Sequence, residues 1–393
     1  MKNNLENYLQ NQLNKRKEEN NLRRLVLPNP TNIDFFSNDY LGLARNDELQ
    51  NLILEEYKLQ INRFKTSRNG STGSRLLSGH NEYFEELEKE LAHFFCAEKA
   101  LFFGSGYHAN VALLSSILKR NNVILYDSLV HASLKEGYRL SNANHFSFKH
   151  NNLEDLEKKI LHIKSTNQTN ENQTIIVVVE SVYSMDGDVC PLQKLVEICE
   201  KYEVNLIVDE AHSTGIYGDN GNGLVAELGL EKRVFARINT FGKGFGTQGA
   251  VVLGSETLIN YLINFALPFI YTTAPPLFQL VSVKKAMDFL KIHQKELNQR
   301  LHQNIELFIS QSEKILDFSN FLNMSKTPIQ IIPIKGNEEC QKVALSLQKE
   351  GFEVRAIKSP TVKKGNERLR ICLHSFNSEV EILRFLEVLR ENL

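Results

Sequence analysis

Lys243 lies between two glycines, 34 residues after Asp209, and Asp209 directly follows the apolar run Val204–Val208. A lysine amine flanked by glycines can be approached from several sides, condense with an aldehyde and swing away again during turnover. An aspartate at the end of a buried strand can hold the proton of a pyridinium nitrogen. Together the two groups indicate the chemistry of pyridoxal phosphate.

Other interpretations of the lysine segment stay open at this point. A Gly-Lys-Gly sequence is also typical of a flexible, solvated turn. In a nucleotide-binding protein or a non-catalytic scaffold, residues 242–246 would instead form a phosphate loop. Their spacing is neither Gly-x4-Gly-Lys-Ser/Thr nor an early Gly-x-Gly-x-x-Gly after a strand, which argues against that function.

The elements that must position these residues are short apolar runs separated by helical stretches. The runs are 100–103, 123–126, 174–179, 204–208 and 250–253. Continuous apolar runs of this length are typical of strands that are buried on both faces of a mostly parallel sheet. The sequence therefore predicts an α/β fold.

Polar residues follow four of these runs, in the segments 104–108, 127–131, 180–184 and 209–212. Ligands of open α/β sheets bind beyond the carboxyl ends of the strands, so these segments are expected to meet at one edge. Gly104-Ser105-Gly106 could present backbone N–H groups to a phosphate at a helix N-terminus. Each segment alone has a simpler interpretation, such as a tight turn, a helix cap at Asp209 or a surface histidine. Four such coincidences together favour a site.

Composition excludes several classes of protein. The chain has 393 residues, 42% hydrophobic and 24% charged, and a net charge of -1. Two domains are expected at this length, and nothing favours binding to nucleic acid or an anionic membrane. The five cysteines lie far apart without a Cys-x-x-Cys pair, which predicts a reduced, cytoplasmic protein without a structural metal. The polar N-terminus and the lack of a long apolar stretch predict neither export nor membrane insertion.

The ordered motifs resemble those of the α-oxoamine synthases, and the resemblance runs from about Asn38 to Arg370. The motifs are Gly104–Tyr107, Asp127–Ser133, Glu180–Asp188, Asp209–Ser213 and Thr240–Lys243. The resemblance implies a fold-type I pyridoxal phosphate enzyme that works as a homodimer with shared active sites. It also implies a large domain with a mostly parallel seven-stranded sheet and a small α+β C-terminal domain. We place an N-terminal helical segment at 1–45, the large domain at 46–285 and the small domain at 286–393.

The resemblance also implies a role for individual residues. Lys243 would bind the cofactor as a Schiff base, Asp209 would contact the pyridine nitrogen, and His131 would stack on the ring. His212 and Ser184 would lie near the phenolic oxygen of the cofactor. The phosphate would be bound by Gly106, Tyr107 and Thr240, and by Thr273 across the dimer. The substrate contacts would be Arg23, Asn38, His131, Thr361 and Arg370, with Arg370 as the carboxylate clamp.

Three further segments indicate the substrates within this family: 37–43, 70–79 and 357–362. They resemble members that join a pimeloyl thioester, on coenzyme A or acyl carrier protein, to L-alanine with loss of carbon dioxide. Lys363-Lys364-Gly365 departs from the pattern, because a proline commonly follows the Thr-Val pair, and this leaves the shape of the acyl entrance open. Glycine or serine in place of alanine remains an alternative.

Overall fold

The computed structural model describes residues 4–64, 69–166, 173–315 and 324–393. The chain divides into two compact units. The larger unit contains Leu41–Ser184 and Val189–Asn298, and the smaller contains Met1–Tyr40, Met185–Asp188 and Gln299–Leu393. The long helix α11 (Leu277–Ile315) contributes residues to both units.

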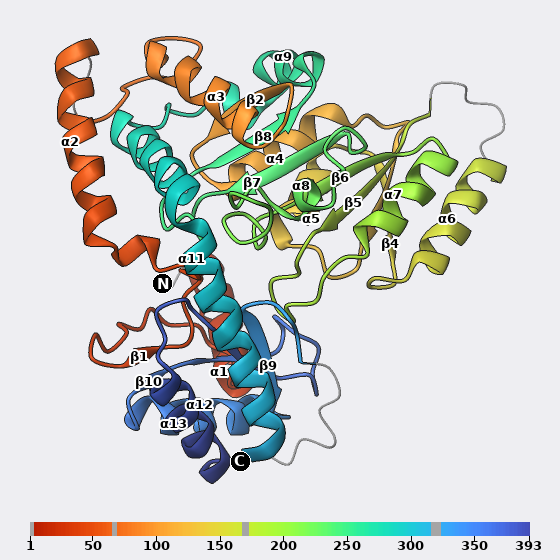
Figure 1. The fold of residues 1–393 in the computed structure, drawn as a ribbon. Helices are drawn as coiled ribbons and strands as arrows, with labels where there is room; N and C mark the ends of the chain where they lie inside the picture. The colour runs from red at the N-terminus through yellow and green to blue at the C-terminus, as the bar shows by residue number, and fades with distance from the viewer. Residues whose placement is uncertain (1–3, 65–68, 167–172, 316–323) are drawn as a thin grey trace. The chain divides into compact units, whose positions relative to one another are not determined.

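Among the described residues, the larger unit is built on one seven-stranded sheet (Figure 1). In sheet order its strands are β2 (Lys99–Phe103), β8 (Ala250–Gly254), β7 (Ala236–Thr240), β6 (Asn205–Asp209), β5 (Ile175–Glu180), β3 (Val123–Asp127) and β4 (Asn144–Phe148). The neighbours from β7 to β4 are parallel, whereas β8 runs antiparallel to both β7 and β2. The predicted α/β class with a mostly parallel sheet is confirmed.

The central strands are almost entirely apolar because both faces of the sheet are covered. All six residues of β5 are buried, and so are the last four of β6. Helices α4 (Gly106–Ile117) and α5 (Ala132–Leu140) pack together, and α4 also contacts β2, β7 and β8. The apolar core of this unit consequently lies along the strands that carry the predicted site residues.

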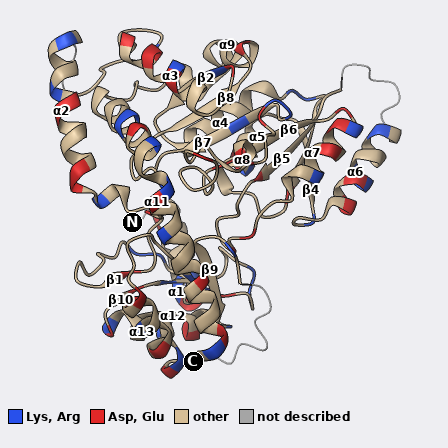
Figure 2. Ribbon diagram, viewed as in Figure 1, with Lys and Arg blue, Asp and Glu red and all other residues tan. Residues whose placement is uncertain are grey.

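The other helices of the larger unit follow the chain around the sheet. They are the 3-10 helix η1 (Leu43–Arg45), α2 (Asp47–Phe64), α3 (Glu82–Phe94), α6 (Leu153–Thr166), α7 (Leu192–Lys201), α8 (Leu224–Glu227), α9 (Glu256–Phe265) and α10 (Leu267–Ile270). Basic and acidic residues are interspersed along them (Figure 2), as in the Lys201–Glu157 ion pair at 2.8 Å between α7 and α6. None of the described helices has the length and apolar character required to cross a membrane.

The smaller unit combines two short sheets with helices. Strands β11 (Arg355–Ile357), β12 (Arg368–Cys372) and β9 (Ile329–Pro333) form an antiparallel sheet in that order, and β1 (Ile33–Asp34) pairs in parallel with β10 (Phe352–Glu353). Its helices are α1 (Asn4–Glu18), α12 (Asn337–Lys349) and α13 (Glu379–Glu391). Because β1 pairs with β10, the chain up to Tyr40 belongs to this unit, whereas the sequence placed a separate segment at 1–45. The units divide after Asn298, whereas the predicted boundary lay at 285.

Candidate active site

Asp209 is the last residue of β6, and its side chain is 3% exposed. Its carboxylate accepts hydrogen bonds from Asn110 Nδ2 at 2.7 Å and from the backbone N–H of Ala211 at 2.9 Å. A buried carboxylate is costly unless donors surround it, and these two donors also fix its orientation. Asp209 therefore stands as an oriented acceptor at the carboxyl edge of the sheet.

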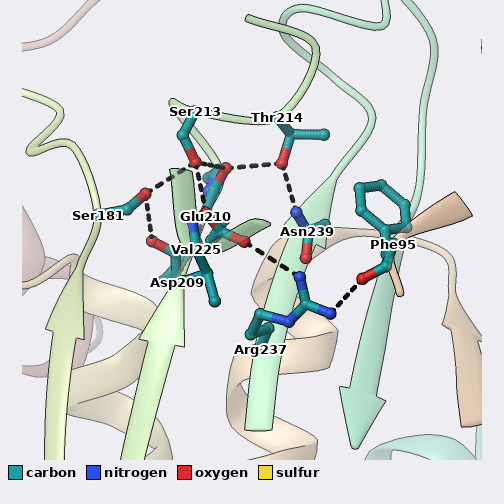
Figure 3. A network of polar contacts seen from close by, with 10 residues as sticks. Phe95, Ser181, Asp209, Glu210, Ser213, Thr214, Val225, Arg237 and Asn239 are labelled. Atoms are coloured by element: carbon teal, nitrogen blue, oxygen red, sulfur yellow. Dashed lines mark hydrogen bonds and ion pairs between the residues drawn. The ribbon is translucent and has the colours of Figure 1, made fainter. Parts of the chain in front are cut away.

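A buried polar network holds the turn that follows Asp209 (Figure 3). Glu210 accepts hydrogen bonds on its carboxylate from Val225 N at 2.9 Å and Ser213 Oγ at 3.0 Å. Asn239 of β7 donates to Thr214 Oγ1 at 3.0 Å. Arg237, also of β7 and 2% exposed, pairs with Glu210 at 3.8 Å and donates to the carbonyl of Phe95. This network joins the Asp209 turn to the strand that leads to Lys243.

Lys243 lies in the turn between β7 and β8, and its side chain is half-buried. The turn is closed by hydrogen bonds from Gly246 N to Lys243 O and from Thr247 N to Phe241 O, both at 2.8 Å. Phe241 and Phe245 anchor the turn and are fully buried. Because backbone bonds and aromatic packing hold it, this segment is not the loose solvated turn that the glycines alone allow.

Two glycines bring the lysine turn against the aspartate turn. A Cβ on Gly244 would lie 2.4 Å from the carbonyl oxygen of Thr214, and a Cβ on Gly215 would lie 2.9 Å from the carbonyl carbon of Gly244. Gly215 also has φ +89, a conformation that residues with a Cβ rarely adopt. The backbones of the two turns thus touch where neither residue has a side chain.

The other predicted ring contacts gather at the same sheet edge. His131 caps the N-terminus of α5, four residues after the end of β3 at Asp127, and its side chain is exposed in the single chain. His212 is 5% exposed in the turn after β6, and Ser184 is half-buried after β5. Although the residue as a whole is exposed, atoms packed around its ring partly desolvate the charged form, and this lowers the pKa of His131. Negative Asp209 opposes the shift, whereas positive Lys243 and Lys135 add to it.

The predicted phosphate contacts lie where α4 begins. Ser105 caps this helix by accepting a hydrogen bond from His108 N, so Gly106 and Tyr107 form its first turn. Thr240, at the end of β7, is 8% exposed, and its Oγ1 has no hydrogen-bond partner among the described residues. A Cβ on Gly106 would lie 2.6 Å from Thr240 Cγ2. A helix N-terminus beside a buried, unpaired hydroxyl is suited to an anion.

Thr273 lies near the same helix end in this chain. It lines a cavity of about 280 Å³ together with Thr272, Gly104, Ser105 and His108. Ala274 N donates to Gly73 O at 2.9 Å, and Ser71 Oγ donates to Pro275 O at 2.8 Å, which holds the segment 271–276 in place. The predicted role of Thr273 across a dimer stays a prediction.

These residues fit pyridoxal phosphate on three observations. Thr240 has an unpaired buried hydroxyl beside a helix N-terminus, where a phosphate would bind. Asp209 is an oriented, buried carboxylate, as a pyridinium nitrogen requires. The exposed side chain of His131 and the half-buried amine of Lys243 follow strands of the same sheet and end at the same edge.

Four of the five predicted substrate residues, all except His131, form two pairs in the smaller unit. Arg370 is 8% exposed, and its Nη2 donates to Asn38 Oδ1 at 3.0 Å. Arg23 Nη2 donates to Thr361 Oγ1 at 3.3 Å. Their contact with a substrate stays a prediction.

Three site residues were given no role from the sequence, although Glu180 and Ser133 lie within the motifs quoted from it. Glu180 ends β5, is 2% exposed and accepts a hydrogen bond from the backbone N–H of His131 at 2.5 Å. Burial raises the pKa of Glu180 to about 8, and the negative charge of Asp209 adds to this increase. Its place at a strand end and the motif that contains Ser133 could have revealed these two residues, whereas Asn110 lies within helix α4 and carries no such signal.

A family model described as aminotransferase class I and II matches residues 30–389. The chain belongs to this family and, within it, to the α-oxoamine synthases, which are pyridoxal phosphate-dependent acyltransferases. The enzyme class and the cofactor that the sequence predicts are thereby confirmed.

The relatives specify the resemblance further. A putative 8-amino-7-oxononanoate synthase of Trichodesmium erythraeum is 38% identical over 91% of this chain and 88% of its own length. The 8-amino-7-oxononanoate synthase of Emericella nidulans is 37% identical over 98% of this chain and 95% of its own. Among solved structures, serine palmitoyltransferase of Sphingomonas wittichii superposes with a TM-score of 0.82 at 25% identity, covering 92% of this chain and 87% of that one.

Proposed function

We propose that this enzyme condenses a pimeloyl thioester with L-alanine to give 8-amino-7-oxononanoate, carbon dioxide and the free thiol carrier. The observation that carries the proposal is the identity of 37% with the Emericella nidulans 8-amino-7-oxononanoate synthase over nearly the full length of both chains. The geometry supports it, because the turn with Lys243 lies against the turn that follows Asp209. The thiol carrier is coenzyme A or acyl carrier protein.

Each residue near the sheet edge has a role in this proposal. Pyridoxal phosphate, when bound, draws electron density from the Cα of the amino acid attached to it. Lys243 would hold the cofactor covalently, and its free amine would take and return the Cα proton. Asp209 would keep a proton on the pyridine nitrogen. His131 would pack on the ring and orient the substrate, while Ser184 and His212 would contact the phenolic oxygen.

The remaining roles concern the two ends of the ligand. Backbone N–H groups of Gly106 and Tyr107, with the Thr240 hydroxyl, would bind the phosphate. Arg370 would bind the carboxylate of alanine through a two-pronged guanidinium contact. In the overall reaction the Cα loses its proton and bonds to the acyl carbon, and the thiolate leaves and takes up a proton. The bond from Cα to the carboxylate then breaks with release of carbon dioxide, and the Cα takes up a proton in its place.

We propose a homodimer in the cytoplasm as the working form. Thr273 of each protomer would then contribute its hydroxyl to the phosphate bound by the other. The cysteines of the described chain are all free, and four of the five are buried, which suits a reducing compartment. Analytical ultracentrifugation with and without cofactor tests the dimer, and a monomeric active enzyme would refute the shared site.

A second candidate uses serine or glycine in place of alanine. The structural likeness to a serine palmitoyltransferase, with a TM-score of 0.82, favours keeping serine in view. A one-methyl difference changes discrimination by only ~1–3 kcal/mol, so the volume of the pocket decides between alanine and glycine.

The test supplies purified enzyme and pyridoxal phosphate with a pimeloyl thioester and alanine, glycine or serine in turn. With alanine we expect release of free thiol and an amino ketone with the mass of the alanine-derived product. Product formed only with glycine or only with serine would replace alanine as the assigned substrate. Lys243→Ala should abolish product and prevent covalent trapping of the cofactor by borohydride. The matched control is Lys232→Ala, at an exposed lysine of the same unit. Turnover retained in Lys243→Ala would refute the mechanism.

A further inference from the structure

Asn110 is a buried amide that joins Asp209 to Ser133. It lies on α4, is 2% exposed, and its Nδ2 donates to Asp209 Oδ2 at 2.7 Å and to Ser133 Oγ at 2.9 Å. A carboxylate only accepts hydrogen bonds, so the amide must turn its NH₂ group toward Asp209. Both amide hydrogens are then used, one for each neighbour.

Ser133 connects Asn110 to His131. Its hydroxyl lies 2.7 Å from His131 Nδ1, and its backbone N–H donates to the same nitrogen at 3.2 Å. A backbone N–H can only donate, so Nδ1 must be an acceptor. Because Ser133 Oγ receives a hydrogen from Asn110, its own hydrogen is free to point to Nδ1. A neutral His131 must therefore carry its proton on Nε2.

The charged groups around His131 are compatible with a neutral ring. Partial desolvation of the ring has the largest effect against a positive charge there; Asp209 opposes it, and Lys243 and Lys135 act in the same direction as the desolvation. The carboxyl group of Glu180 accepts the backbone N–H of His131, which fixes the main chain of this residue. The ring is thus held at its backbone and at Nδ1.

Asn110 does not fulfil the hydrogen-bonding requirements of its own amide. Its Oδ1 is buried and has no partner among the described residues. An unpaired buried carbonyl destabilises the folded chain, so the Oδ1 atom of Asn110 contributes nothing to stability. An apolar residue in its place would remove this carbonyl but would leave buried Asp209 with one donor fewer. The contribution of Asn110 therefore lies in the two groups that its NH₂ group positions.

We propose that Asn110 and Ser133 are positioning residues that tie Asp209 to His131 through one hydrogen-bonded chain and hold His131 as the Nε2–H tautomer. The consequence for the reaction rests on the proposed function, in which Asp209 and His131 contact the cofactor at its nitrogen and at its face. His131 then presents a donor, not an acceptor, on its outer side. A change at the buried amide would disturb both contacts together.

Two variants test the hydrogen bonds of Asn110 and of Ser133 separately. Asn110→Leu removes both donors at once, and Ser133→Ala removes the hydroxyl but keeps the backbone N–H on Nδ1. The matched control is Ser116→Ala, also on α4, whose hydroxyl donates to the carbonyl of Ala112 at 2.7 Å. Full-length protein labelled with ¹⁵N-histidine is studied by NMR with pyridoxal phosphate and after its removal, and His131→Gln identifies the signals of His131.

We expect the wild-type enzyme and Ser116→Ala to show His131 protonated on Nε2. Ser133→Ala should keep this tautomer but raise the pKa of His131 by about one unit, because a donor that favours the neutral ring is lost. Asn110→Leu should bind pyridoxal phosphate roughly 10- to 100-fold more weakly, and the cofactor-free protein should also be less stable to heat because buried Asp209 loses a donor. A merely structural role of Asn110 would lower thermal stability but leave the cofactor affinity of the folded protein unchanged.

Three results would overturn the inference. They are a proton on His131 Nδ1 in the wild-type protein, an unchanged pKa of His131 in Ser133→Ala, and wild-type cofactor affinity in a folded Asn110→Leu variant. If Asn110→Leu does not fold, the first two readouts still decide. Because the NMR signals of the cofactor-free chain do not depend on the reaction, failure of the proposed function, seen with Lys243→Ala, is distinguishable from failure of this inference.

Discussion

Replacing Arg237 by methionine tests the buried network that supports the Asp209 turn. Arg237 and Glu210 are 2% and 0% exposed, and their closest charged atoms lie 3.8 Å apart. Removing one partner of a buried pair leaves the other charge without compensation, which costs about 3–5 kcal/mol. Methionine keeps much of the length of arginine, so the change removes charge and the hydrogen bond to Phe95 O with little loss of packing.

The loss of folding stability in Arg237→Met should grow as the pH rises. Burial already raises the pKa of Glu210, and Arg237 counteracts this. Without Arg237 that pKa rises further, so the folded variant keeps a proton that the unfolded chain releases. Stability from such a group is present at low pH and is lost as pH rises, so Arg237→Met should be most destabilised in alkaline solution.

The assay is urea unfolding of the cofactor-free protein followed by circular dichroism. The matched control is Arg233→Ala, because Arg233 pairs with Glu200 at 2.5 Å on the surface, where a pair contributes about 0–1 kcal/mol. The double variant Arg237→Met with Glu210→Gln should recover much of the loss, since no buried charge remains. A cost for Arg237→Met no larger than that for Arg233→Ala would refute the reasoning.

Two further predictions concern the cofactor contacts. Gly106→Ala should weaken cofactor binding by at least ~10-fold, because the new Cβ would lie 2.6 Å from Thr240 Cγ2. Cofactor affinity is measured by fluorescence titration with Gly70→Ala as the control, since a Cβ on Gly70 would meet nothing within 4 Å; equal affinities of the two variants would contradict the prediction. The pKa of Glu180 is raised to about 8 in the folded protein, so the folded protein keeps a proton that the unfolded chain releases. The cofactor-free wild type should therefore lose stability between about pH 5 and 8, by up to ~1.4 kcal/mol per pH unit, relative to Glu180→Gln. Parallel urea-stability profiles of the two proteins would show that Glu180 does not titrate in this range.

The sequence predicts those parts of the molecule whose signal is local. The five apolar runs are strands β2, β3, β5, β6 and β8, because strands covered on both faces need continuous apolar residues. Strand β7 has no such signal, since it carries the buried Arg237 and Asn239, whose partners come from other parts of the chain. Strand β4 was missed for the opposite reason, because four of its five residues are exposed.

The residues of the candidate site likewise fall into those with a local signal in the sequence and those without one. Asp209, His131 and Lys243 follow strands or a strand-like run, so their clustering at one edge could be expected from the order of the chain. Asn110 could not, because its partners Ser133 and Asp209 lie 23 and 99 residues away. A buried amide on an apolar helix becomes interpretable only when the fold shows which carboxylate it faces.

The contact between Gly215 and Gly244 restricts how this enzyme can change over generations. A side chain at either position would push the aspartate turn and the lysine turn apart, since each would meet backbone atoms within 3 Å. A substitution at one glycine cannot be compensated by shrinking the other residue, because glycine has no side chain to lose. New amino acid or acyl preferences are therefore expected to arise from residues elsewhere, while this pair stays as it is.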